Sequence, residues 1–166
     1  MRSTFSHHFS HNWITQFDRM QRWSNRAQLA LKKSELAEED LDDIYAFFIS
    51  AFSLRDWLKN SSEIQINNLD QKLHAFKYWG LCRDMANGLK HFELNSPSFD
   101  PNFTIWCANL SRSPKIVNEY WYILADNKIL SMQLVVESTT KFLSDLLNPY
   151  KERNPVIPKL KRQNRS

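Results

Sequence analysis

The chain has 166 residues, a length typical of a single domain, and its 42% hydrophobic content is enough to form a buried core. Only two residues are glycine, which disfavours barrels and sandwiches with many tight turns and favours helices. Of the net charge of +4, residues 151–166 alone carry +5, so the rest of the chain is close to neutral and the basic balance does not indicate a nucleic-acid-binding face on the domain.

Several classes of protein are excluded or disfavoured by simple patterns. No stretch approaches the roughly 18 apolar residues of a membrane span, and the N-terminus lacks the apolar core of a signal peptide. Cys82 and Cys107 form no motif, so we expect a reduced, cytoplasmic chain without a disulfide. No Cys or His pair has the spacing of zinc ligands, and we expect neither a metal nor a cofactor.

The first half of the chain is predicted to be helical. Residues 1–10 are predicted to be disordered, and a first helix covers about residues 11–33, with apolar residues at helical spacing. Ser34 is a plausible N-cap for a second helix that runs to about Asn60, since a group of acidic residues follows it. The middle of that helix, "IYAFFISAF", is apolar almost all round, which predicts a central, buried helix.

The second half combines helices with strands. A third helical region covers about residues 69–94, and Tyr78–Gly80 is a point at which it can break. Residues 103–131 are rich in β-branched and aromatic residues and contain an Asp-Asn turn, so a β-hairpin is predicted there. A last helix covers about residues 132–147, and Pro149 is expected to close it.

Together these elements predict a mainly α fold: a bundle of about four helices with a small antiparallel β-hairpin inserted before the last helix. The predicted organisation is a disordered N-terminus (residues 1–10), one helical-bundle domain (11–150) and a basic flexible tail (151–166), in which two prolines disfavour regular structure.

Two polar clusters stand in apolar surroundings, and the first closes the second helix. Arg55 and Asp56 follow the apolar run and share helix faces with core residues. An unpaired buried charge costs several kcal/mol, so these side chains either find partners or lie where the helix emerges into water.

The second cluster is "CRDMANGLKHF", residues 82–92. Asp84, Asn87 and His91 lie on one helical face, while Cys82 points toward an apolar face, where thiols are usually inert. Gly88 inside this helix suggests the close approach of a backbone or a ligand. The remaining members are two cations that flank Asn87: Arg83 and Lys90.

The two clusters are not neighbours in a simple hairpin. If the second and third helices pack antiparallel, Arg55 lies opposite the start of the third helix, and a turn of the chain near Gly80 is needed to bring it to Asp84 and His91. The alternative for the second cluster is an ordinary solvated helix face that includes a histidine.

The motifs "SLRDWLKN" and "CRDMANGLKHF" resemble those of a widespread group of bacterial and mobile-element proteins, which show "HLRDWI-K-N" and then "DLANGSKH" about thirty residues later. The resemblance covers about residues 44–147. The group is similar to HEPN domains, helical bundles that occur in toxins, phage-defence systems and RNA-processing proteins, often as homodimers. The matching residues are Arg55, Asp56, Trp57, Asp84, Ala86, Asn87, Gly88, Lys90 and His91.

This resemblance implies RNA binding or metal-independent RNA cleavage. Many HEPN proteins carry an Arg followed by a His, and the counterpart here is "RDMANGLKH", with seven residues between Arg83 and His91. Cleavage needs an acid, a base and a cation for the phosphate. His91 is the candidate acid or base, and Asp84 and Arg55 complete the catalytic candidates. RNA or phosphate contacts are assigned to Asn87, Lys90 and Arg83, and orientation of the imidazole to Asp56.

A non-enzymatic function explains the same residues. The polar stripe then fixes helix packing, and the chain is an interaction or scaffold module that binds a partner protein of the same system. Enclosed polar side chains favour this second hypothesis, whereas exposed side chains along a groove favour RNA chemistry.

Overall fold

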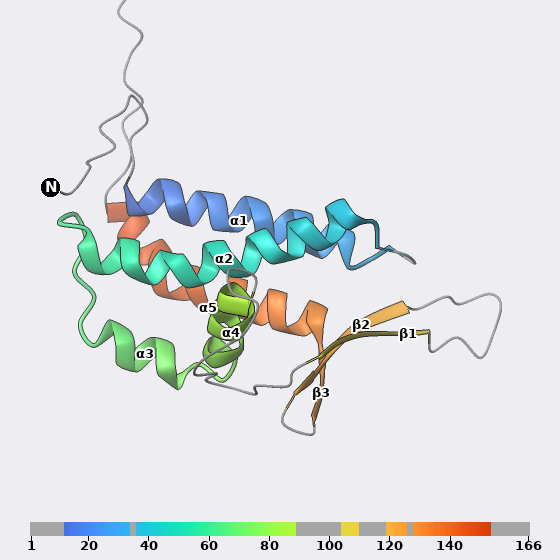
Figure 1. Cartoon of the computed structure of the whole chain (residues 1–166). Helices are drawn as coiled ribbons and strands as arrows, with labels where there is room; N and C mark the ends of the chain where they lie inside the picture. Colours follow the sequence, from blue (N-terminus) through green and yellow to red (C-terminus); the bar gives the residue numbers. More distant parts are fainter. Residues whose placement is uncertain (1–11, 34–35, 89–103, 110–118, 126–127, 154–166) are drawn as a thin grey trace, which may run out of the picture.

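The computed structural model describes residues 12–33, 36–88, 104–109, 119–125 and 128–153. As predicted, this part of the chain is mainly helical, with a small antiparallel sheet before the last helix. Figure 1 shows α1 and α2 side by side above α5, with the sheet projecting from the end of the bundle where α5 begins. The elements are α1 (Trp13–Ala30), α2 (Glu38–Asn60), α3 (Leu69–Ala75), α4 (Trp79–Gly88), β1 (Thr104–Asn109), β2 (Glu119–Ala125), β3 (Lys128–Ser131) and α5 (Met132–Arg153).

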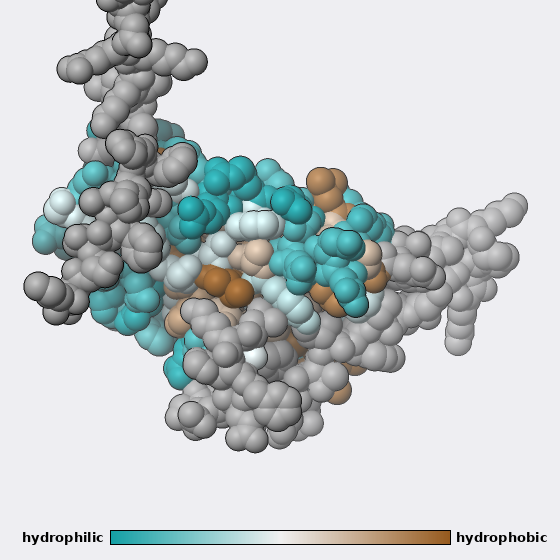
Figure 2. All heavy atoms as spheres, turned by 45° about the horizontal axis from the view of Figure 1, so that its top comes forward, coloured by the Kyte–Doolittle hydropathy of each residue, from teal (hydrophilic) through white to brown (hydrophobic). Residues whose placement is uncertain are grey.

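The first helix covers the core with one face, as its spacing predicts. Asn12 caps the helix by accepting a hydrogen bond from the Thr15 N–H at 2.9 Å. The opposite side faces water, and Figure 2 shows a largely hydrophilic surface with small hydrophobic patches over this side of the molecule. The expected inner residues are all buried: Trp13, Phe17, Met20, Ala27 and Leu31.

The second helix begins at Glu38, four residues later than the cap predicted at Ser34, which lies outside the described residues. The Asp40 carboxylate accepts hydrogen bonds from the Ala37 N–H at 3.0 Å and from Lys33 Nζ at 2.6 Å. These two bonds lower the pKa of Asp40. The start of α2 is therefore stabilised by a carboxylate inside its first turn, and the N-cap residue is Ala37 and not the predicted serine.

The middle of α2 is the centre of the core, as predicted. The rings of Phe47 and Phe48 are fully buried and meet edge to face at 5.2 Å between centroids. The other buried apolar residues of α2 are Ile44, Ala51, Leu54 and Leu58.

The third helical region is broken, two residues before the point at which the sequence allowed a break, and Trp79 and Gly80 are already helical. α3 ends at Ala75 and α4 begins at Trp79, so the chain turns at Phe76–Tyr78. The rings of Phe52 on α2 and Trp79 lie 5.5 Å apart, and Cys82 Sγ lies 3.5 Å from Thr139 Oγ1 of α5. α4 therefore packs against α2 on one side and against α5 on the other.

Cys82 is buried within this packing, in agreement with its predicted place on an apolar face. Burial raises the pKa of its thiol to about 12, although the contact with Thr139 lowers it in part. Because the thiolate is the nucleophilic form, Cys82 is an inert structural residue.

The sheet is an antiparallel meander of order β1-β2-β3. Ile123 of β2 is buried against the bundle, and its partner Leu130 on β3 packs against the same core. On the opposite side of the sheet, the neighbouring pair Leu124 and Ile129 is exposed. The predicted turn at residues 126–127 lies outside the described residues.

The last helix differs from its prediction, because it continues through Pro149 and ends at Arg153. Lys151 Nζ pairs with Asp18 of α1 at 2.6 Å and lies 5.6 Å from the centroid of the Phe17 ring. These contacts stabilise the final turn. Pro149 has no backbone N–H, so one carbonyl group in the preceding turn lacks its helical donor, and because Pro149 is exposed, water can donate to that carbonyl instead. The first three residues predicted to belong to the flexible tail are therefore helical, and residues 154–166 lie outside the described part.

Candidate functional site

The charges that end α2 are paired with α3. Arg55 Nε donates to Asp70 Oδ1 at 2.7 Å, and Lys59 Nζ donates to Asp70 Oδ2 at 2.9 Å. A longer contact of 3.4 Å joins Arg55 to Asp56 on its own helix. Arg55 thus lies opposite the start of the third helical region, as antiparallel packing predicts. Its main partner, Asp70, belongs to neither of the two predicted clusters.

Two cations around one carboxylate change its electrostatics. The hydrogen bonds from Arg55 and then Lys59 lower the pKa of Asp70 to about 2, and Asp70 in turn raises the pKa of Arg55. The arrangement is a partly exposed three-residue salt bridge that ties the end of α2 to α3.

We expect this salt bridge to stabilise the fold only while Asp70 is ionised. Its pKa is lower in the folded chain, at about 2, than its ordinary value of 3.8, so its contribution is complete above about pH 4 and is lost as the pH falls toward 2. The measurement is the difference in Tm between the wild type and Asp70→Asn, followed by circular dichroism in low salt. The difference should shrink from pH 5 to pH 2, and a constant difference over this range would contradict the assignment.

The second cluster begins inside the protein. Asp84 is only 1% exposed, and the neighbouring Met85 and Ala86 are buried as well. Arg83, Asn87 and Gly88 are half-buried. The polar face predicted for this helix is therefore not simply exposed to solvent at Asp84, because α4 is covered on several sides.

The structure does not bring Arg55 and Asp84 together. The side-chain contacts of Arg55 are with Asp70 and Asp56, while Arg83 and Asp84 have other interaction partners. Lys90 and His91 lie outside the described residues, so their relation to Arg55 stays a prediction. The five candidate residues that the structure describes divide between two places: Arg55 and Asp56 at the end of α2, and Arg83, Asp84 and Asn87 on α4.

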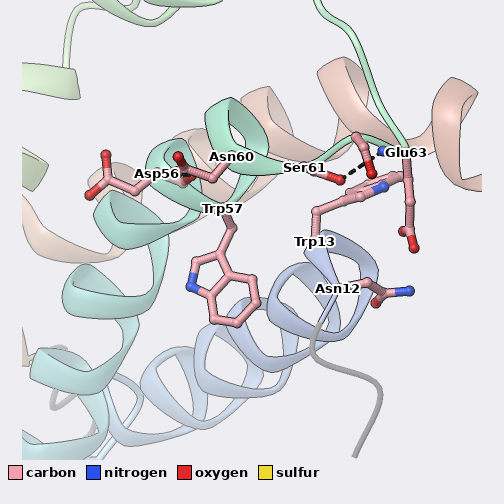
Figure 3. A pocket seen from close by; sticks show the side chains of 8 residues that line it. Asn12, Trp13, Asp56, Trp57, Asn60, Ser61 and Glu63 are labelled. Carbon is pink, nitrogen blue, oxygen red and sulfur yellow. Dashed lines mark hydrogen bonds between the residues drawn. The ribbon is translucent and has the colours of Figure 1, made fainter. Parts of the chain in front are cut away.

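A pocket of about 440 Å³ lies beside the first of these places, between the start of α1 and the end of α2. Figure 3 shows Trp57 projecting from α2 toward α1, with Trp13 at the junction of α1 and the turn that follows α2. Of the candidate residues that the structure describes, Asp56 alone lines it. The other described lining residues are Asn12, Trp13, Trp57, Asn60, Ser61, Ser62 and Glu63.

The pocket combines negative charge with aromatic walls. Asp56 and Glu63 contribute two exposed carboxylates, and among the described residues that line the pocket none is basic. The Trp13 side chain is fully buried, and its Nε1 has no hydrogen-bond partner in the described structure. The sequence does not reveal this pocket, because three segments build it and only the end of α2 carries a recognisable motif.

Within the described residues, no group of three or more potential metal-ligating side chains comes together. None of the described helices has the length and apolar character needed to cross a membrane. No protein-family model matches the chain, and no curated protein or solved structure is significantly similar to it.

Proposed function

We propose that the chain is a non-catalytic helical interaction module in which the polar residues of α4 stabilise the packing of the bundle. The observation that supports this function best is the burial of Asp84, which is 1% exposed on a helix that packs against both α2 and α5. A carboxylate in this position has no access to a macromolecular substrate, so its role is to hold α4 in place.

The contacts of Arg55 support the same proposal. A cation that stabilises a transferring phosphate must be free to meet it. Arg55 instead shares Asp70 with Lys59 and also contacts Asp56, so its charge is already balanced. In this module both polar clusters are structural, and the partner is a protein.

RNA binding with metal-independent cleavage is the second candidate, and one observation favours it. Arg83 and Asn87 are one helical turn apart on α4 and are both half-buried rather than enclosed. They precede Lys90 and His91, the residues of the motif that resembles HEPN ribonucleases. In this mechanism His91 moves the proton of the 2′-OH or of the leaving oxygen, and Arg83, Asn87 and Lys90 bind the phosphate.

Incubation of the full chain with total RNA in EDTA separates the two functions. We expect no cleavage by the wild type, because an interaction module has no catalytic acid–base pair. Two variants are tested in the same assay: His91→Ala, and as a matched control His74→Ala, which removes an exposed histidine from α3. Cleavage by the wild type and His74→Ala that is lost in His91→Ala would overturn the proposal in favour of a ribonuclease.

A further inference from the structure

The pocket between α1 and α2 is suited to a cation. Within the part of the chain that the structure describes, its charged lining residues are Asp56 and Glu63, both acidic and exposed. It also lies at the C-terminal end of α2, where the helix dipole places partial negative charge on the last carbonyl groups. The half-buried ring of Trp57 provides an aromatic wall against which a Lys or Arg side chain can pack.

The same pocket also offers a hydrogen-bond donor that lacks an acceptor. Trp13 is fully buried, and its Nε1 has no partner in the described structure. In Figure 3 the nitrogen edge of this indole lies next to the turn from Ser61 to Glu63, which forms a wall of the pocket. An occupant that satisfies every group must therefore bring both a cation and an acceptor such as a peptide carbonyl, and a basic peptide has both.

The sequence contains such a peptide, directly after the end of α5. Residues 154–166 hold four cations and no acid: Lys159, Lys161, Arg162 and Arg165. Pro155 and Pro158 favour the extended polyproline conformation that docks readily into aromatic grooves.

The position of the end of α5 allows this segment to reach the pocket. The salt bridge of Lys151 with Asp18 holds the last turn of α5 against α1, and Trp13 lies about 7.5 Å away from Asp18 along the α1 axis. From Arg153, six extended residues span about 20 Å, which brings Lys159 within range.

We propose that the pocket lined by Trp13, Trp57, Asp56 and Glu63 binds the basic C-terminal segment of the same chain. Lys159 or Lys161 contacts the two carboxylates and the Trp57 ring, and a backbone carbonyl of the segment accepts from Trp13 Nε1. A short tether gives an effective concentration of about 1 mM or more, so weak individual contacts are enough to keep the segment bound.

Carboxyl-to-amine coupling with a zero-length carbodiimide tests the contact in the full chain. An equal mixture of ¹⁵N-labelled and unlabelled protein is treated, and the linked peptides are identified by mass spectrometry. We expect links from Asp56 or Glu63 to Lys159 or Lys161 within single molecules. The absence of these links would overturn the proposal, and so would links found only between labelled and unlabelled chains, which would place the segment in the pocket of a second copy.

A second measurement follows the rate of trypsin cleavage after Lys159, Lys161, Arg162 and Arg165. In the double variant Asp56→Asn/Glu63→Gln the rate should rise at least about threefold, since cleavage of a reversibly bound segment follows its unbound fraction. The matched control, Glu39→Gln/Asp42→Asn, removes the same charge from exposed positions at the opposite end of α2 and should leave the rate unchanged. Equal rates in the pocket variant and the wild type, or equal acceleration in both double variants, would contradict the proposed site.

Discussion

Replacement of Phe47 by alanine is expected to lower the free energy of unfolding by about 3–5 kcal/mol, as is typical when a fully buried aromatic side chain is truncated. Phe47 is 0% exposed, packs edge to face with Phe48 and lies in the middle of the central helix. The surrounding side chains come from several helices and cannot all move into the space left by the ring, so a cavity remains. Urea denaturation followed by circular dichroism measures the change.

The matched control is Leu29→Ala on α1, where the side chain is 64% exposed. This variant should change the free energy of unfolding by less than about 0.5 kcal/mol, as surface substitutions usually do. If the two variants lost the same stability, Phe47 would not occupy the centre of the core.

Asp84→Ala is expected to lower the free energy of unfolding by about 1–3 kcal/mol, because the partners of a buried polar group are left unsatisfied when it is removed. Asp84 lies on α4 between buried residues, and this burial distinguishes it from the other polar residues of the helix. Asp84→Asn, which retains the size and one acceptor oxygen, should lose less. Urea titration of both variants gives the comparison.

Glu152→Ala, which removes an exposed acid from the last turn of α5, provides the reference for a change in charge alone. A fully stable Asp84→Ala variant would remove the structural role of Asp84, and with it the main support for a non-catalytic module.

The pattern of apolar residues was sufficient to predict most of the fold. Helical spacing identified the buried side of α1, and the continuous apolar run identified α2 as the central helix. The β-branched and aromatic stretches appear as the strands of the sheet, and the break between α3 and α4 lies within two residues of its predicted place. These features are local or depend on a single repeating pattern, which is why they can be read from one sequence.

Element ends were predicted less well because they depend on competition between neighbouring groups. The N-cap of α2 is Ala37, and the side chain that stabilises the start of the helix is Asp40 inside the first turn, which also has Lys33 as a partner. Pro149 normally ends a helix, but the contacts of Lys151 with Asp18 and Phe17 stabilise one more turn.

The candidate site was the hardest part to predict, for reasons of packing. A helical wheel divides α4 into a polar and an apolar face, yet α4 lies between α2 and α5, so Asp84 is enclosed despite its place on the polar face. The partner of Arg55 is Asp70, fifteen residues later and beyond a connector whose path no pattern specifies. Pairings of this kind follow from the tertiary arrangement and not from spacing along one element.

The contacts between the first and last helices also have a consequence for synthesis of the chain. Asp18 and Lys151 are separated by 133 residues, and Ser24 of α1 similarly meets Thr140 of α5. At translation rates of about 5–20 residues per second, roughly 7 to 27 seconds pass between the appearance of the two helices. During this interval α1 has no α5 to pack against, so the Phe17 ring, which lies against Lys151 in the folded chain, lacks this cover until the last helix has been made.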